Sequence, residues 1–140
     1  VENVNCVPTD HLVNTQIDDT INVLKFFPDK YSQAPILASA GWDNKIRLWT
    51  VNYQVNQSNN TAQIASNNVC TGTLNDPILK ISWRKNTPAV FAGCCDGSIH
   101  LFDVTTQQTQ LVGKHEKGVQ GLHFLEDNNM NILISGGWDS

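Results

Sequence analysis

Apolar and polar residues alternate along many short stretches of this chain. Ile46 and Leu48 flank Arg47, and Ile99 and Leu101 flank a histidine in the same way. A period of two places alternate side chains on opposite faces of a strand, whereas a helix needs apolar residues three and four positions apart. The pattern therefore predicts an all-β chain built from short strands.

The predicted strands belong to a unit that repeats. After Asp43 and again after Asp96, isoleucine follows at the third position, leucine at the fifth, an aromatic residue at the sixth and valine at the eighth. Before each of these aspartates, and before Asp139, a β-rich run ends in small residues, which is typical of a strand entering a tight turn. The aspartates lie 53 and 43 residues apart, and four-stranded propeller blades repeat at about 40–45 residues.

A further apolar run stands upstream of each turn, beginning at Ile21, Ile78 and Val119. Each unit is therefore predicted to contain strand, loop, strand, turn and strand, followed by a less regular fourth stretch. The interval between Asp43 and Asp96 is the longer of the two. Its extra residues fall in 52–68, a stretch that is polar and rich in Asn and Gln. We interpret this stretch as a surface loop or as a lengthened outer strand.

Composition and charge narrow the class of protein. The 140 residues are 40% hydrophobic and carry a net charge of −4, which suits a globular chain and disfavours broad binding to phosphate backbones. No apolar run is long enough to cross a bilayer and no basic-apolar leader begins the sequence, so we expect no membrane insertion. The spacing of Cys6, Cys70, Cys94 and Cys95 fits no disulfide framework and predicts a reduced, intracellular protein.

Ser135, His115 and Asp139 contain the side chains of a nucleophilic triad. No nucleophile elbow and no oxyanion motif accompany them, so we favour a structural role for all three. The sequence also lacks the phosphate-binding, zinc-hydrolase and dinucleotide motifs. We therefore expect no catalytic residues and a protein that is not an enzyme.

Cys94 and Cys95, with His100 nearby, raise the alternative of a metal site. Adjacent cysteines do not easily ligate one tetrahedral ion, and the usual paired spacing is absent. Small residues at a buried strand end explain them better, so we expect no metal and no cofactor.

The repeated units resemble the WD-repeat β-propeller family, from about Leu12 to the end of the chain. In that family a buried polar relay of His, Ser, Asp and Trp holds each blade. The third unit matches this relay at His115, Ser135 and Asp139. Physically, the turn carboxylate accepts from backbone N–H groups, and leaving a buried polar group without a partner costs about 1–3 kcal/mol.

The first two units match the relay only in part. The first unit matches at Ser39, Asp43 and Trp49, with Ile17 where the histidine would stand. We expect these units to depend more on apolar packing. The second unit keeps Asp96, and its replacements are Leu74, Ala92 and Phe102.

The resemblance also implies how the chain is organised. We expect an N-terminal fragment of about two and a half to three blades from a ring that closes with about seven blades in this family. We predict that residues 1–17 hold a strand that closes the ring, 18–69 the first repeat with its long polar loop, 70–112 the second, and 113–140 a truncated third.

Finer features resemble one branch of the family, the messenger-RNA export factors that dock at nuclear pores. The segments "DDTINVLKFFP", "ILASAGWDNKIRLWTV", "CCDGSIHLFDV", "GKHEKGVQGLHF" and "ISGGWDS" carry this resemblance in order. It implies a scaffold in the nucleus, at the pore and in the cytoplasm, which binds a GLEBS-type nucleoporin segment and meets messenger ribonucleoprotein or RNA indirectly. The alternative is the related spindle-checkpoint adaptor, which binds checkpoint kinases and which "LVGKHEKGV" also resembles.

Two tryptophans, Trp42 and Trp138, stand directly before turn aspartates, where they should project at the top rim of a blade. Exposed Trp side chains are strong anchors for a partner segment, and the alternative is packing against the neighbouring blade. Trp49 and Trp83 follow the alternating apolar pattern and are predicted to lie in the core. Charged residues on predicted loops of the same face complete the candidate binding set: Lys45, Asp18, Asp19, Asp76 and Lys117.

Overall fold

The computed structural model describes residues 11–13, 17–28, 34–58, 61–127 and 130–139. All regular secondary structure in these residues is β-strand, which confirms the predicted all-β class. The strands are β1 (Ile21–Phe26), β2 (Ile36–Gly41), β3 (Lys45–Asn56), β4 (Thr61–Thr73), β5 (Ile78–Arg84), β6 (Ala89–Cys94), β7 (Ser98–Asp103), β8 (Thr109–Lys114), β9 (Val119–Asp127) and β10 (Met130–Gly137).

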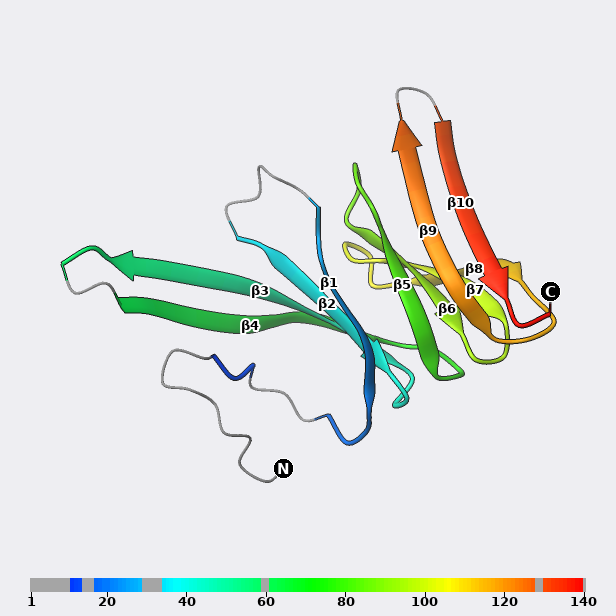
Figure 1. The fold of residues 1–140 in the computed structure, drawn as a ribbon, viewed down its shortest axis with the longest axis horizontal. Helices are drawn as coiled ribbons and strands as arrows, with labels where there is room; N and C mark the ends of the chain where they lie inside the picture. Colours follow the sequence, from blue (N-terminus) through cyan, green and yellow to red (C-terminus); the bar gives the residue numbers. More distant parts are fainter. Residues whose placement is uncertain (1–10, 14–16, 29–33, 59–60, 128–129, 140) are drawn as a thin grey trace.

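The ten strands form three antiparallel sheets in chain order (Figure 1). The first sheet is β1-β2-β3-β4, the second is β5-β6-β7-β8, and the third pairs β9 with β10. The stretches predicted as a less regular fourth part are regular strands, β4 and β8, because backbone pairing with β3 and β7 orders them. This succession of stacked sheets is the arrangement expected of a partial propeller.

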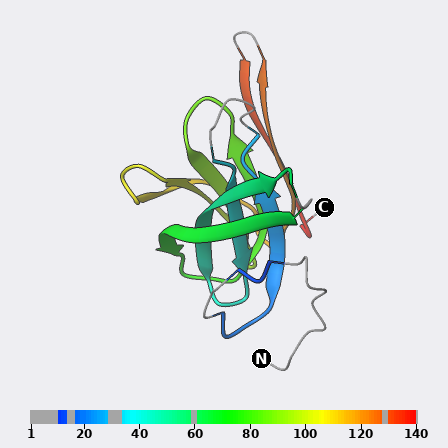
Figure 2. The same ribbon diagram turned by 90° about the vertical axis from the view of Figure 1, so that its left-hand side faces the viewer.

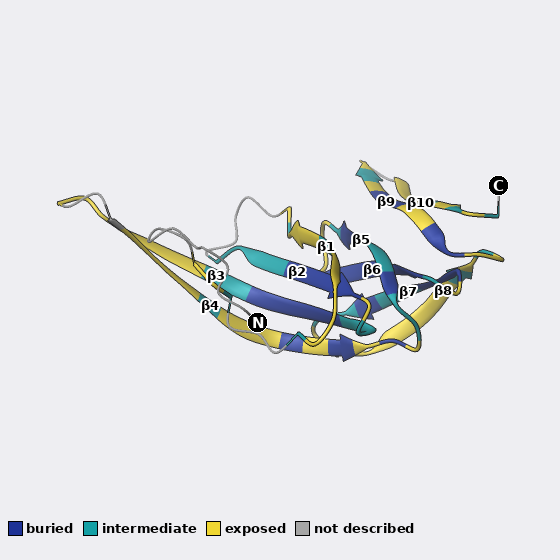
Figure 3. Cartoon of the chain, turned by 60° about the horizontal axis from the view of Figure 1, so that its bottom comes forward, coloured by how far each residue is buried: buried dark blue, intermediate teal, exposed yellow. Residues whose placement is uncertain are grey.

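The core lies between the sheets. The first and third sheets cover the two faces of the second sheet (Figure 3). Val90 and Ala92 on β6 pack toward the first sheet, and Phe91 between them packs toward Val119 and Phe124 of the third. Strand alternation sends successive side chains to opposite faces, so a strand buried on both faces is apolar at every position. The predicted core residues Trp49 and Trp83 are 2% and 5% exposed.

Two glycines allow the sheets to approach closely. A methyl group at Gly72 would lie 2.6 Å from the ring of Phe102, and one at Gly93 would lie 2.5 Å from Val119. Real Cβ atoms do not come this close, so these positions need a residue without a side chain. The large apolar side chains of the next sheet occupy the space instead.

The described residues of the polar stretch 52–68 lengthen β3 and β4, which fits the predicted alternative of a lengthened outer strand and not that of a surface loop. Asn52 to Asn56 of β3 pair with Ala65 to Thr61 of β4, and this part, which we call the ribbon, projects beyond the rest of the first sheet (Figures 1 and 2). The strand β2 does not accompany it, since the pairing of β2 with β3 reaches only Thr50.

Two of the predicted repeat boundaries fall inside strands of the structure. The boundaries after residues 69 and 112 fall inside β4 and β8, so the sheets divide the chain elsewhere than the predicted sequence units do. In the segment predicted to close the ring, residues 1–10 and 14–16 lie outside the described residues, and 11–13 and 17 belong to no strand. His11 Nε2 lies 2.9 Å from Ser66 Oγ on β4. The predicted unit limits stay predictions.

Candidate binding rim and its aspartate turns

Each of the three sheets has the same backbone hydrogen bond at one of its ends. The N–H of the residue before each turn aspartate donates to a carbonyl just before the first strand of the same sheet. The three bonds are Trp42 N to Thr20 O at 2.9 Å, Cys95 N to Pro77 O at 2.9 Å, and Trp138 N to Gly118 O at 3.0 Å. The starts of β1, β5 and β9 and the ends of β2, β6 and β10 therefore share one end, along the lower and right-hand side of Figure 1. We call these loops and turns the rim.

The turns that follow the aspartates use the left-handed region of the backbone. Asn44 has φ of 62° and Gly97 has φ of 86°, each directly after its aspartate. Asn and Gly are the residues that tolerate this conformation best. At Gly97 a side chain would also come within 2.3 Å of the carbonyl of His115, so the second turn excludes any other residue.

In the first turn, Asp43 is held by its own hairpin. Oδ1 accepts from the backbone N–H of Lys45 at 3.2 Å, and Oδ2 lies 2.5 Å from Nη2 of Arg47. Burial raises the pKa of Asp43, but the hydrogen bonds from Arg47 and Lys45 and the charge of Arg47 outweigh it, so the pKa lies below its ordinary value. The carboxylate is charged and paired although it is mostly covered.

In the second turn, Asp96 is held by the strand that follows it. Oδ1 accepts from the backbone N–H of Ser98 at 2.9 Å and from its hydroxyl at 2.5 Å. His100 Nε2 lies 3.1 Å from the same hydroxyl oxygen. Burial raises the pKa of Asp96, but the two hydrogen bonds from Ser98 and the nearby Lys114 and His100 together outweigh it, so the pKa lies below its ordinary value.

In the third turn, Asp139 meets a different loop. Its Oδ2 accepts from the backbone N–H of Glu116 at 2.9 Å, which is the largest cause of its lowered pKa. His115 Nδ1 lies 3.1 Å from Oδ1 of Asp139, and Nε2 lies 2.9 Å from Ser135 Oγ. With the proton on Nδ1, the imidazole donates to Asp139 and accepts from the hydroxyl of Ser135. The three residues assigned to the relay in this unit are therefore in contact.

Arg47 and His100 were missed as rim residues by the sequence reasoning. Both stand four positions after a turn aspartate, in the two units that lack the histidine of the relay. A basic residue at this position in both units was the available signal, but the alternation of Ile46 and Leu48 presented Arg47 only as the polar face of a strand. In the structure Arg47 is 7% exposed and supplies the positive charge at the first turn.

The remaining relay positions of the first unit do not close a network around tryptophan. Ser39 is buried at 1% exposure. The indole Nε1 of Trp49 is buried and has no hydrogen-bond partner in the part of the chain that the structure describes. Trp49 therefore contributes to the first sheet through packing, and a greater dependence of this unit on apolar contacts stays a prediction.

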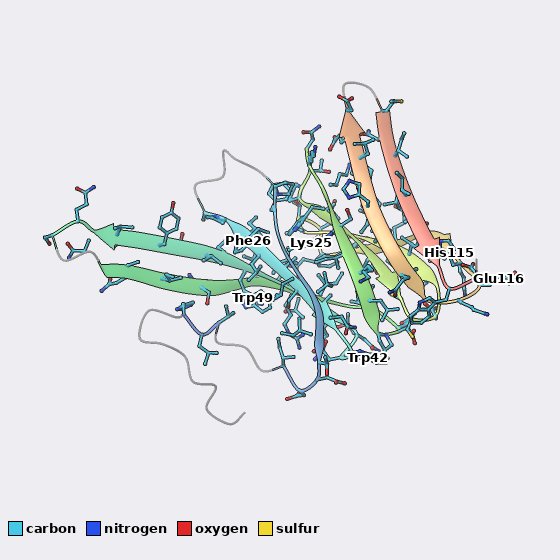
Figure 4. All side chains as sticks on the ribbon, viewed as in Figure 1. Lys25, Phe26, Trp42, Trp49, His115 and Glu116 are labelled. Atoms are coloured by element: carbon cyan, nitrogen blue, oxygen red, sulfur yellow. The ribbon has the colours of Figure 1, made fainter. Side chains whose placement is uncertain are left out.

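Trp42 and Trp138 both reach the surface of the rim, with 45% and 54% of each residue exposed. Figure 4 shows Trp42 near the start of β1, with His115 and Glu116 farther along the rim, at the loop before β9. Trp138 also packs on the loop before β9, since a methyl group at Gly118 would lie 2.7 Å from its ring. Both tryptophans are therefore exposed on the rim, and whether they contact a partner stays a prediction.

The charged candidates lie on the same rim with different exposures. Asp18 and Asp19 precede β1 and are exposed, Asp76 precedes β5 and is partly covered, and Lys117 precedes β9 and is exposed. Lys45 was expected on a loop, but it is the first residue of β3 and is partly covered. The fold brings these residues to one end of the sheets, and whether they contact a partner stays a prediction.

The described residues offer little for metal or redox chemistry. Residues 11–13, 17–28, 34–58, 61–127 and 130–139 contain no group of three or more His, Cys, Asp or Glu side chains that could hold a metal ion. Cys70, Cys94 and Cys95 are free thiols, and burial raises the pKa of Cys94 to about 11, which keeps it protonated. Cys6 lies outside the described residues.

Two further findings concern cavities and membranes. A hollow of about 460 Å³ lies on the ribbon, away from the rim, and its lining has no charged side chain: Asn52, Gln54, Gln63, Ile64 and Ala65. No helix in the described part of the chain is long and apolar enough to cross a membrane.

A comparison with known protein families finds repeats in the part of the chain that contains the first two aspartate turns. The family model for the WD domain, G-beta repeat, matches residues 3–50 and 67–103, which is more than half of the chain. The chain belongs to the WD-repeat family. The two matched segments contain the aspartate turns at Asp43 and Asp96, together with the first half of β3 and the whole of β7.

Several WD-repeat relatives are similar over most of the chain. The mRNA export factor rae-1 of Caenorhabditis elegans is 33% identical over 130 residues, which is 93% of this chain and 32% of the relative. The Poly(A)+ RNA export protein of Schizosaccharomyces pombe is 32% identical over 87% of this chain and 31% of its own length. Protein Rae1 of Drosophila melanogaster is 27% identical over 87% and 32%. The chain thus spans about a third of the length of these relatives.

Proposed function

We propose that the protein is a non-enzymatic scaffold in messenger-RNA export, whose rim docks a GLEBS-type segment of a nucleoporin. The observation that carries the proposal is the likeness to two proteins whose names describe RNA export, which runs over 87–93% of this chain. The rim adds a physical means of docking, because Trp42 on the first sheet and Trp138 on the third are 45% and 54% exposed at this end of the sheets.

The chemistry of the rim suits a partner segment better than a reaction. Tryptophan side chains bury a large area with little loss of conformational freedom, and they dominate the energetics of many interfaces. Ser135, His115 and Asp139 have the contacts of a hydroxyl–imidazole–carboxylate triad. We assign these contacts to holding the third turn, because they fix the loop before β9 to the end of β10.

The test is a titration of the full-length protein with a synthetic GLEBS-type segment. We expect Trp42→Ala and Trp138→Ala each to weaken binding by about tenfold or more, as truncation of an interface hot spot does. Tyr53→Ala is the matched control, because it removes an aromatic side chain that is 66% exposed on the ribbon, away from the rim. Circular dichroism of each variant confirms that the fold is retained.

Unchanged affinity in both tryptophan variants would remove the rim from the proposal. Failure of the unaltered protein to bind the segment at all would remove the nucleoporin partner. A checkpoint-kinase peptide in a parallel titration then tests the alternative adaptor function. The names of the Caenorhabditis elegans and Schizosaccharomyces pombe relatives favour export.

The proposed function places the protein in nucleocytoplasmic transport, in the nucleus and at the pore as well as in the cytoplasm. We propose that it meets messenger ribonucleoprotein through partners, because a net charge of −4 opposes tight direct binding to a polyanion. Titration with RNA at several salt concentrations checks this point, and tight binding with a steep salt dependence would contradict it.

A further inference from the structure

The ribbon has an open edge made by β4. In the first sheet β4 is the last strand, so among the described residues no other strand pairs with its outer side. From Ala62 to Asn68 it pairs with β3 on its inner side without a break in register, because the one register shift lies beyond, between Leu48 and Trp49. We call residues 62–68 the β4 edge.

Proteins usually protect such an edge. Charged side chains, proline or a bulge on an edge strand prevent it from pairing with another chain. The β4 edge has none of these, and the sequence contains no charged residue and no proline from Val51 to Asn75. The ribbon also exposes apolar side chains, since Tyr53 is 66% and Val55 58% exposed.

The side chains of the β4 edge suit a second copy of the same strand. Gln63 and Asn67 are exposed and, being four residues apart on a strand, lie on the same face. An amide side chain carries both donors and an acceptor, so it can pair with another amide. In an antiparallel pair centred on Ala65, Gln63 would stand opposite Asn67 of the second copy, and the contact would be the same from both sides.

Charge also favours self-association here over other parts of the surface. The 140-residue chain carries a net charge of −4, and two copies repel each other where acidic groups meet. The uncharged ribbon adds no such repulsion. It also projects beyond the sheet, which allows two ribbons to meet without bringing the rims together (Figure 1).

We propose that the β4 edge pairs antiparallel with the β4 edge of a second copy, so that two ribbons form one four-stranded sheet. The contact of His11 Nε2 with Ser66 Oγ joins two side chains. Side chains stand away from the plane in which a strand pairs through its backbone, so the backbone groups of Ser66 take no part in this contact. The proposal does not depend on the proposed function at the rim.

The experiment is sedimentation velocity of the full-length protein over a concentration series. The protein is expected to reach a dimer as concentration rises. Q63K with N67K places like charges opposite each other across the proposed contact and should raise the dimer dissociation constant about tenfold or more. T109K with Q110K on the exposed strand β8 adds the same charge elsewhere and should leave the dimer unchanged.

A charge-swap pair tests the arrangement of the strands. Q63E with N67E should also dissociate the dimer, and mixing it with Q63K/N67K should restore a dimer that contains one copy of each. A protein that stays monomeric over the whole series would overturn the proposal. So would a dimer that both pairs of edge variants leave intact, which would point instead to apolar side chains exposed elsewhere, such as Ile134 on β10.

Discussion

The turns at Asp43 and Asp139 begin with the same Trp-Asp pair and are held in different ways. Asp43 meets Arg47, four residues later in the same hairpin, and their side chains are 13% and 8% exposed. Asp139 meets His115, which lies 24 residues earlier in another loop, and these side chains are 20% and 23% exposed. The first pair closes one hairpin, whereas the second fixes a loop to a strand end.

This difference shows which part of the turn is constant. Each turn carboxylate accepts a backbone N–H, from Lys45 in the first turn and from Glu116 in the third. The positively charged or polar partner comes from whichever element lies near. A family pattern that asks only for a histidine therefore overlooks a turn in which arginine has taken over the same role.

The largest effect is expected from Asp43→Ala. This change leaves the buried guanidinium of Arg47 without its carboxylate and removes the acceptor for the Lys45 N–H. We expect the free energy of unfolding to fall by about 1–3 kcal/mol, measured by urea denaturation. Asp103→Ala is the control, because Asp103 accepts from Thr105 and Thr106 in an exposed turn with no cation. An equal loss in both variants would contradict the role of Arg47.

Arg47→Met should have a smaller effect, because methionine keeps much of the apolar stem and Asp43 keeps its backbone donor. We expect a loss of about 1 kcal/mol. A double-mutant cycle with Asp43→Ala isolates the pair, and a coupling energy of about 1 kcal/mol is expected. Strict additivity of the two substitutions would show that the ion pair contributes nothing.

Asp139→Ala should lower the midpoint of thermal unfolding by less than Asp43→Ala does. Its partners lie nearer to solvent, where water screens the interaction between the charges. Calorimetry of the two variants side by side measures the order. A larger drop for Asp139→Ala would mean that the complete relay, and not burial, decides how much a turn contributes.

The smallest expected effect is the part of the pH dependence of stability that the Asp43 carboxylate causes. Its pKa in the folded protein lies below the ordinary value of 3.8, so its contribution is fully present above about pH 4 and is lost as pH falls through the folded pKa. Unfolding measured between about pH 5 and pH 3 should show a steeper loss for the unaltered protein than for Asp43→Ala. Identical slopes would show that the carboxylate is not perturbed by folding.

Much of the fold follows from local patterns in the sequence. Alternation around Leu48 and Leu101 predicts strands, and the small residues before each aspartate predict their ends. The regular strand conformation of β4 does not follow from the sequence. Asn and Gln have little preference for strands, and only pairing with β3 sets their conformation. The partnership of Arg47 with Asp43 depends on how deeply the turn is buried, which a single sequence does not show.

The candidate rim was predictable in part. The position of Trp42 and Trp138 before a turn predicts their place at one end of the sheets, where the structure puts them. Their exposure depends on the neighbouring loops, such as the one at Gly118 that lies under the ring of Trp138. The sequence pattern contains no information about that contact.

Hydrogen exchange of the full-length protein, with and without the GLEBS-type nucleoporin segment, is the most direct test of the claim that the rim is the docking surface. The account predicts that bound segment slows exchange at the backbone amides of residues 42–45, 95–98 and 138–139, and leaves the ribbon amides unchanged. Slower exchange on the ribbon, with no change at these three turns, would contradict it.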